Sequence, residues 1–296
     1  MISELSNITF FIMGYKGYKV LDAFINKYGV KPISCVISER DINMENDYYK
    51  EIKELCFVNK VPFFNRKDTY ELDSKYSFAI SWKWILYGIN NLIIFHDSIL
   101  PKYRGFAPLV NALINGESEV GVTALFANDF YDRGNIISQR KQKVTYPIKI
   151  NDAIDLITKS YVDLVMEISE KILRQENIVA YPQNESLATY SLWLDEDDYR
   201  IDWSKDSYYI KRFIDSVGFP YKGALTTIDD KSFRIYDSVI FEDVPIENRS
   251  PGKVIFIHNH CPVVVCGKGL LMITKMVDND TKQDVLPFKR LRVRFK

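Results

Sequence analysis

The chain has 296 residues, with 39 basic and 39 acidic side chains, and 47% of its residues are hydrophobic. These values fit a globular protein long enough for one large domain or two, and they exclude collagen-like and low-complexity chains. A net charge near zero argues against a protein that binds along a nucleic-acid backbone, because such proteins normally present a basic face. It does not exclude a small anionic ligand held by a few positive groups.

Cysteine usage and hydropathy indicate the cellular setting. Four cysteines in a chain of this length do not form a disulfide scaffold, and they fit a reducing compartment. The longest apolar runs are strand-sized, well short of the roughly 18 residues that a membrane span needs. Glu4 stands where a signal peptide would carry lysine. We therefore expect a cytoplasmic protein with no membrane partner.

The first part of the chain alternates short apolar runs with helix-like segments. Helices are expected at 18–28, at 44–58, at 109–115 between Pro108 and Gly116, and at 151–174, where apolar residues recur every three or four positions. Apolar runs typical of buried strands cover 8–13, 33–38, 61–64, 77–82, 92–95 and 121–126. This alternation predicts an α/β fold with a Rossmann-like, mostly parallel sheet and flanking helices.

The pattern changes after about residue 183. A helix is expected over 206–217, and short strands over 224–228, 232–238, 252–258, 263–266 and 270–275, the last two joined by a hairpin. This change predicts two domains: an α/β domain over 1–185, and a helix with a small, mainly β, barrel-like domain over 186–296.

Zinc-ligand residue types also occur in this second part, at 258–261 and at Cys266. The run Pro262–Val265 between the two cysteines reads as a strand that separates them along its length. The hairpin interpretation explains the apolar pattern, so no metal site is expected.

His96 is the most informative of the three histidines. It directly follows the apolar run 92–95, which places it at the C-terminal end of a parallel strand, where open α/β sheets bind ligands. A second segment, 128–137, follows the strand 121–126 and carries Asp129 and Asp132, whose carboxylates could orient a histidine or hold a water. Each segment alone is equally consistent with a polar strand end or a solvated turn.

Together, and in this order, the two segments resemble the formyltransferase family that uses 10-formyltetrahydrofolate. The family motif His-x-Ser-Leu-Leu-Pro-x-x-Arg-Gly corresponds to 96–105, its Asn-Gly helix end to 115–116, its Gly-Val-Thr strand to 121–123 and its Asp-x-Gly-x-Ile loop to 132–136. Weaker similarity continues at 188–191, 201–203 and 220–224, so the resemblance covers most of the chain. It is greatest to the sugar-nucleotide N-formyltransferases, and 106–109 with 121–127 are similar to the branch of the pseudaminic acid pathway.

The resemblance implies transfer of a formyl group from 10-formyltetrahydrofolate to the amine of a nucleotide-linked amino-deoxy sugar, such as a UDP- or dTDP-4-amino-4,6-dideoxy sugar, for surface glycan biosynthesis. His96 is then the expected general base, because imidazole accepts protons near neutral pH. Asp132 is expected to orient the imidazole or to hold a relaying water. Relatives of this type are often dimers, so a homodimer is expected.

On the cofactor side, the resemblance places Trp84, Ile85 and Leu86 as an apolar wall for the pterin ring, with Asp129 also assigned to cofactor binding. The alternative is that these apolar residues belong to the core or to a dimer surface.

On the substrate side, Tyr15, Lys16 and Gly17 follow the first strand, and a helix N-terminus with a lysine favours anions such as the phosphates of a sugar nucleotide. A plain strand-to-helix turn is the alternative. Lys83 and Arg104 are also assigned to substrate binding. The alternative for Arg104, which its chemistry favours, is that its guanidinium holds its own loop in place through hydrogen bonds.

One position departs from the family pattern. The family usually has an asparagine two residues before the histidine, where its amide stabilises the oxyanion, and this chain has Ile94. Losing one such donor commonly costs about 10²–10³ in rate. A backbone N–H, protonated His96 or Asn128 could replace it, whereas Asn90 and Asn91 are expected at the other end of the strand.

Three other functions therefore stay open. Formylation of the aminoacylated initiator tRNA would call for a basic face, which the balanced charge does not suggest. Hydrolysis of the formyl-folate would release formate without an acceptor. The departure at Ile94 also permits a folate- or sugar-nucleotide-binding protein without turnover.

Overall fold

The computed structural model describes residues 7–42 and 44–296, so Glu4 lies outside the described part. Two compact units make up the chain. The first comprises the residues up to 108 together with 119–143 and 154–192, and the second comprises 109–118, 144–153 and 193–296. The domain boundary that the sequence places between residues 185 and 186 stays a prediction.

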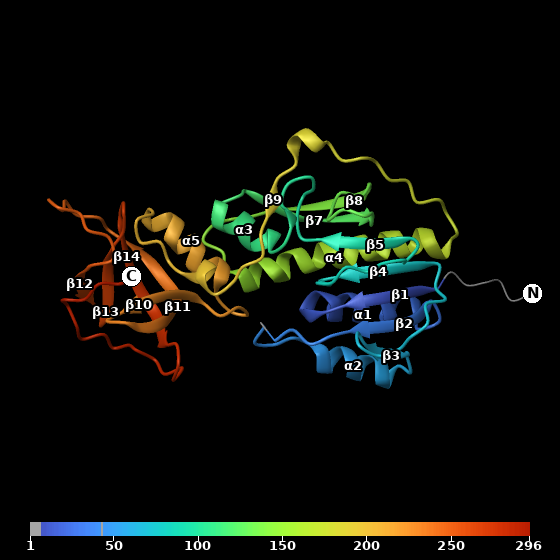
Figure 1. Cartoon of the computed structure of the whole chain (residues 1–296), viewed down its shortest axis with the longest axis horizontal. Coiled ribbons are helices and arrows are strands. Elements are labelled where there is room, and N and C mark those ends of the chain that lie inside the picture. Colours follow the sequence, from blue (N-terminus) through green and yellow to red (C-terminus); the bar gives the residue numbers. More distant parts are fainter. Residues whose placement is uncertain (1–6, 43) are drawn as a thin grey trace, which may run out of the picture. The chain divides into compact units, whose positions relative to one another are not determined.

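A seven-stranded sheet forms the centre of the first unit (Figure 1). Its strand order is β3-β2-β1-β4-β5-β7-β8; the first five strands run parallel, and β7 and β8 are antiparallel to their neighbours. The strands are β1 (Ile8–Ile12), β2 (Ile33–Ser38), β3 (Phe63–Asn65), β4 (Tyr76–Ile80), β5 (Leu92–His96), β7 (Glu119–Phe126) and β8 (Ile136–Lys143). The predicted Rossmann-like, mostly parallel sheet is confirmed, with β8 as an added strand.

The helices that accompany this sheet are α1 (Gly14–Tyr28), α2 (Tyr49–Val58) and α4 (Ile150–Leu173). Helix α1 begins earlier than expected because Gly17 lets its first turn approach β1: a Cβ at Gly17 would lie 2.9 Å from the Cβ of Ile12. Helix α2 begins later than expected. The Asp47 carboxylate accepts hydrogen bonds from the N–H groups of Asp41 and Tyr49, which holds residues 44–48 as a loop.

An aromatic core lies on the face of the sheet that α1 and α4 cover. Phe10 contacts Phe24 of α1 and Phe78 of β4, and Phe95 of β5 contacts Phe78 and Tyr161 of α4, with ring centroids 5.0–6.3 Å apart. Loop residues including Trp82 and Leu86 pack on the opposite face, over Phe11 and Ile37. Since successive side chains of a strand alternate between faces, His96 and Ile94 point to this loop-covered face.

An antiparallel sheet of five strands forms the second unit, in the order β10-β11-β14-β13-β12. Helix α5 (Ser207–Val217) begins where the sequence predicts, because the Asp206 side chain accepts a hydrogen bond from the Tyr209 N–H at 2.9 Å. The other α-helices and strands of the described residues are α3 (Pro108–Asn115), β6 (Arg104–Gly105), β9 (Tyr190–Ser191), β10 (Ala224–Ile228), β11 (Lys231–Phe241), β12 (Val254–His258), β13 (Cys261–Val265) and β14 (Leu270–Asp278).

The chain end closes this second sheet. Lys296 exchanges two backbone hydrogen bonds of 2.9 Å with Thr227 on edge strand β10. On the other edge, the Val254 N–H of β12 donates to Val293, and the Phe295 N–H donates to Gly252. Both edges are thus tied by one short segment, which accounts for the predicted barrel-like character and protects edges that would otherwise pair with other chains.

No helix among the described residues is long and apolar enough to cross a membrane.

Candidate active site

His96 is the last residue of β5, at the C-terminal edge of the parallel strands. Its backbone pairs with Thr123 on β7, and the residue is only 7% exposed. The apolar run before it therefore predicted its place correctly. A buried imidazole at this edge is positioned for a ligand, since open α/β sheets bind ligands outside the C-terminal ends of their strands.

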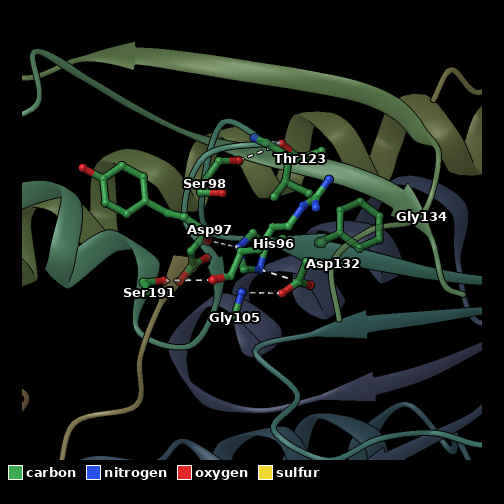
Figure 2. A network of polar contacts seen from close by, with 12 residues as sticks. His96, Asp97, Ser98, Gly105, Thr123, Asp132, Gly134 and Ser191 are labelled. Carbon is green, nitrogen blue, oxygen red and sulfur yellow. Dashed lines mark hydrogen bonds and ion pairs between the residues drawn. The ribbon is translucent and has the colours of Figure 1, made fainter. Parts of the chain in front are cut away.

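Both ring nitrogens of His96 face oxygen atoms (Figure 2). The Nε2 atom lies 2.8 Å from the backbone carbonyl oxygen of Tyr103, and the Nδ1 atom lies 3.4 Å from Oδ1 of Asp132. Because a carbonyl oxygen can only accept a hydrogen bond, Nε2 must carry a proton. The basic lone pair of the neutral imidazole then lies on Nδ1, next to a carboxylate that would stabilise the imidazolium.

Asp132 is itself fixed in place. The backbone N–H of Gly105 donates to its Oδ2 atom at 2.8 Å, and the side-chain amide of Gln183 donates to its backbone carbonyl at 2.7 Å. Its φ of 52° lies in the left-handed region, where Asp is tolerated better than most residues. The sequence prediction that Asp132 meets His96 therefore agrees with the arrangement of the two side chains, whose catalytic roles stay a proposal.

The loop between His96 and Gly105 is held from the neighbouring strands. The hydroxyl of Ser98 donates to the carbonyl of Lys102 at 2.7 Å, and the hydroxyl of Thr123 donates to the carbonyl of Ser98 at 2.7 Å. The Thr123 oxygen also accepts from the N–H of Leu100 and from the side chain of Gln139. The Ser and Thr of the sequence motifs therefore shape the loop from which the Tyr103 carbonyl and the Gly105 N–H reach the site.

Arg104 has a structural role. Its side chain is fully buried, and it donates to Gln183 (2.8 and 3.1 Å) and to both carboxylate oxygens of Glu185 (2.8 and 2.9 Å). The hydrogen bonds from Arg104 hold the pKa of Glu185 below its usual range. A guanidinium that is buried and already paired has no surface to offer a substrate, so its assignment to substrate contact is corrected. It pins the loop, as its chemistry favoured.

Gly134 explains the glycine of the Asp-x-Gly motif. A Cβ at this position would overlap the carbonyl oxygen of Phe126 and lie 2.8 Å from its carbonyl carbon. We expect Gly134→Ala to displace the loop that carries Asp132 and to lower the free energy of unfolding by about 2–3 kcal/mol. Thermal or urea unfolding would measure this. Gly218→Ala is the control, because its Cβ would meet its nearest neighbour at 3.4 Å; equal effects of the two changes would contradict the prediction.

The predicted cofactor residues occupy different environments. Leu86 packs on the buried cluster around Phe11, and Ile85 is 47% exposed. Trp84 lies between Trp82, whose ring centroid is 5.3 Å away, and the Arg66 guanidinium, 4.3 Å from its own centroid. Asp129 is exposed, in the turn after β7. Leu86 therefore packs against the core, which is the alternative given for these apolar residues, while Trp84 and Ile85 remain partly accessible to solvent.

The predicted substrate residues after β1 form the first turn of α1, which no side chain caps at Met13. Lys16 forms an ion pair with Asp97, and its assignment to substrate binding stays a prediction. Tyr15 stacks edge-on against Tyr48, 5.2 Å away. Lys83 forms an ion pair with Asp41 and is nearly half exposed.

The oxyanion position needs a donor other than Ile94. Ile94 pairs with Ala79 and Leu125 in the sheet, two residues before His96 on the same face. Asn128 follows β7 near the beginning of β5, since Phe126 pairs with Ile93 and the strands are antiparallel. Asn91 donates to the carbonyl of Lys75 at that same end. The imidazolium of His96 and backbone N–H groups therefore remain the donors closest to the site.

Sequence patterns did not reveal several residues that shape the site. Gln183 and Glu185 lie about 80 positions after Arg104, and no local motif links them to it. Tyr161 lies within the helix expected over 151–174, and its hydroxyl hydrogen-bonds Asp97. The one available signal was the presence of Asp97 itself, a charged residue directly after the candidate base.

Comparison with protein families gives two matches. A model described as formyl transferase matches residues 75–164, and one described as formyl transferase, C-terminal domain, matches residues 194–285. Methionyl-tRNA formyltransferase of Staphylococcus aureus is 34% identical over 160 residues. That alignment covers 54% of this chain, and it spans only half the length of this relative.

Solved structures share the fold. The sugar 3N-formyltransferase WlaRD, crystallised with dTDP and 5-N-formyl-THF, has a TM-score of 0.68 at 17% identity, over 92% of this chain and 97% of its own. The N-formyltransferase of Helicobacter canadensis, in complex with folinic acid and dTDP-3-aminofucose, has a TM-score of 0.70 at 17% identity, over 90% and 98%. HypX of Aquifex aeolicus with tetrahydrofolic acid reaches 0.62 at 18% identity, over 95% of this chain but 45% of its own.

Proposed function

Because the chain belongs to the formyltransferase family, carrying both its N-terminal and its C-terminal domain, we propose that it transfers a formyl group from 10-formyltetrahydrofolate to a primary amine. The observation that carries the proposal is the buried pair of His96 and Asp132 at the C-terminal edge of the sheet. We retain residues 1–185 as the proposed catalytic domain and 186–296 as the second domain.

The chemistry requires one base and a way to stabilise charge. The neutral amine attacks the formyl carbon, and a tetrahedral oxyanion forms with a positive charge on the attacking nitrogen. His96 accepts the proton of that nitrogen at Nδ1, and Asp132 stabilises the imidazolium. The C–N bond to the folate then breaks, its nitrogen takes up a proton, and the formamide and tetrahydrofolate leave. The hydrogen bond from Nε2 to the Tyr103 carbonyl keeps the ring in this tautomer.

The folate would lie on the loop-covered face of the sheet, which His96 shares. Two polar atoms there, Ser81 Oγ and Trp82 Nε1, are buried without a hydrogen-bond partner among the described residues. A pterin ring offers amide donors and acceptors to such atoms, and Trp84 and Ile85 offer it an apolar wall. Asp129 stays assigned to the same ligand on the opposite loop. These features support formyl-tetrahydrofolate as the donor.

For the acceptor we propose the amino group of a nucleotide-linked amino-deoxy sugar. The support is that two sugar N-formyltransferase structures match this fold over 90% or more of both chains. The first turn of α1, with Tyr15, presents backbone N–H groups without a side-chain cap, which suits a diphosphate, while the Gly17 N–H donates to the Met13 carbonyl within the helix. A 4-amino-4,6-dideoxy sugar of the pseudaminic acid pathway is the finer form of this proposal.

The initiator tRNA is the second candidate, favoured by the identity to methionyl-tRNA formyltransferase. Against it stands the charge of residues 193–296, which carry 17 basic and 16 acidic side chains. A domain that holds a phosphate backbone normally carries a clear positive excess. We therefore rank the sugar nucleotide first. The four unpaired cysteines fit the proposed cytoplasmic location, and the homodimer stays a proposal as well.

An end-point assay by mass spectrometry tests this proposal. The protein and 10-formyltetrahydrofolate are incubated with UDP- and dTDP-linked 3-amino and 4-amino sugars, with charged initiator tRNA, or with no acceptor. We expect a mass increase of one formyl group on one amino sugar and none on the matching sugar with a hydroxyl in place of the amine. Formylated tRNA, or formate released without an acceptor, would contradict the amino sugar as the acceptor. Folate binding without any product would contradict the proposed enzymatic activity.

A further inference from the structure

Three tyrosines form a cluster at the C-terminal edge of the parallel strands, where α1 and α2 begin. Tyr15 and Tyr18 lie on one face of α1, since residues three apart in a helix are neighbours on its surface. Tyr48 directly precedes α2 and packs on both, with its ring centroid 5.2 Å from that of Tyr15 and 5.7 Å from that of Tyr18. The buried residues of α1, such as Val20 and Phe24, lie on its other face. The tyrosine cluster is therefore partly exposed and separate from the core of the sheet.

Tyr48 is held in a backbone conformation that bulky side chains rarely adopt. Its φ of 53° lies in the left-handed region, and strained residues of this kind are concentrated at ligand-binding sites. Its N–H donates to the side chain of Asn46 at 3.3 Å, and its carbonyl accepts from the N–H of Ile52 at 3.0 Å. A glycine would adopt this turn without strain. The tyrosine ring therefore supplies something that the turn itself does not need.

The tyrosine cluster also carries polar groups that suit a nucleotide base. The Lys19 ammonium lies 5.6 Å from the centre of the Tyr15 ring and 5.8 Å from that of the Tyr18 ring. Burial raises the pKa values of Tyr15 and Tyr48, and the Asp155 carboxylate of α4 contributes to both shifts. Both hydroxyls thus stay protonated near neutral pH. Aromatic faces, hydroxyl donors and one cation match the flat ring and the carbonyl oxygens of a base.

The position of the tyrosine cluster matches the length of a nucleotide-linked sugar. In the strand order, the end of β5 that carries His96 is two steps from β1 and three steps from β2. At about 4.8 Å per step, these separations are about 10 and 14 Å. With the amine at His96, the sugar leads to the diphosphate at the first turn of α1, and the ribose and base then extend to the segment between β2 and α2. Open α/β sheets bind ligands along this edge, outside the C-terminal ends of the strands.

We propose that Tyr48, together with Tyr15 and Tyr18, binds the base of the nucleotide-linked amino sugar. The base stacks on the partly exposed ring of Tyr48, and Lys19 lies beside its polar edge. These residues bind and position the acceptor, and they do not touch the reacting atoms. The identity of the ligand rests on the proposed function, whereas binding of a nucleoside diphosphate can be measured without turnover.

Calorimetric titration of Tyr48→Gly with UDP and with dTDP tests the proposal. Because glycine adopts positive φ freely, the variant should be at least as stable to urea as the unchanged protein. Loss of one stacking ring should raise the Kd of the nucleotide that binds by about 5–100-fold. Tyr48→Phe should keep most of the affinity. Phe57→Ala is the matched control, since Phe57 is 82% exposed at the other end of α2.

Saturation-transfer NMR separates a contact with the base from a merely structural role of the ring. In the unchanged protein, the base protons of the bound nucleotide should receive more saturation than its ribose protons. Unchanged affinity of Tyr48→Gly, an equal loss in Phe57→Ala, weaker saturation of the base than of the ribose, or no binding of either nucleotide would overturn the proposal. None of these outcomes decides whether the protein transfers a formyl group, which the end-point assay measures separately.

Discussion

Replacing His96 by alanine is expected to lower the rate of formyl transfer by about 10²–10⁴, the range that one general acid–base group contributes. The reason is geometric as well as chemical. The ring of His96 lies between the Asp132 carboxylate, 3.4 Å from Nδ1, and the Tyr103 carbonyl oxygen, 2.8 Å from Nε2. Single-turnover kinetics with the acceptor found in the end-point assay would measure the loss. KM for the folate should change little, because His96 is expected to act on the transferred proton.

His260→Ala is the matched control for this change. His260 stands with Asn259 in the exposed turn between β12 and β13, where both residues have positive φ. Its removal deletes the same side chain without touching the sheet edge that carries the candidate site. We expect its rate to equal that of the unchanged protein. If His96→Ala kept more than a tenth of the activity, His96 would not be the base, and a proton path through Asp132 and water would replace it.

The sequence predicted those features that depend on local pattern. An apolar run of four residues before His96 was enough to place it at a strand end, because buried parallel strands are apolar throughout. Strand β8 was missed for the opposite reason. Its sequence IISQRKQK carries mostly polar residues, since it is an edge strand paired on one side only. The alternation of that strand is too weak to separate from a loop.

The candidate site also contains what no local pattern could reveal. The contact between His96 and Asp132 spans 36 positions and depends on how the loop after β7 folds back. The pairing of Lys16 with Asp97 spans 81 positions, and the sequence alone suggests only a phosphate ligand at Lys16. In the sequence, a lysine beside a glycine-containing turn looks the same whether it binds a phosphate or pairs with a distant carboxylate. Only the tertiary structure separates them.

Arg104→Met is expected to have the largest effect on stability, with a loss of about 2–4 kcal/mol in the free energy of unfolding. The Met side chain fills a similar volume but removes the hydrogen bonds that Arg104 donates to Gln183 and Glu185. Gln183 in turn donates to the carbonyls of Asp132 and Gly134. The same change should therefore loosen the Asp132 loop and lower the formyl-transfer rate, which urea unfolding and kinetics would measure side by side.

Arg133→Met separates this burial effect from simple loss of charge. Arg133 also pairs with Glu185, at 3.1 Å, but its side chain is 39% exposed, and exposed ion pairs contribute little. We expect nearly unchanged stability.

The pH dependence gives a further check. Because Arg104 lowers the pKa of Glu185 in the folded state, the stability from this contact is present above the unfolded value near 4.5. It is lost as the pH falls through the lower folded value, so the unfolding free energies of the unchanged protein and of Arg104→Met should converge in acid. Equal losses from the two arginines at pH 7, or a difference that grows in acid, would contradict the role assigned to Arg104.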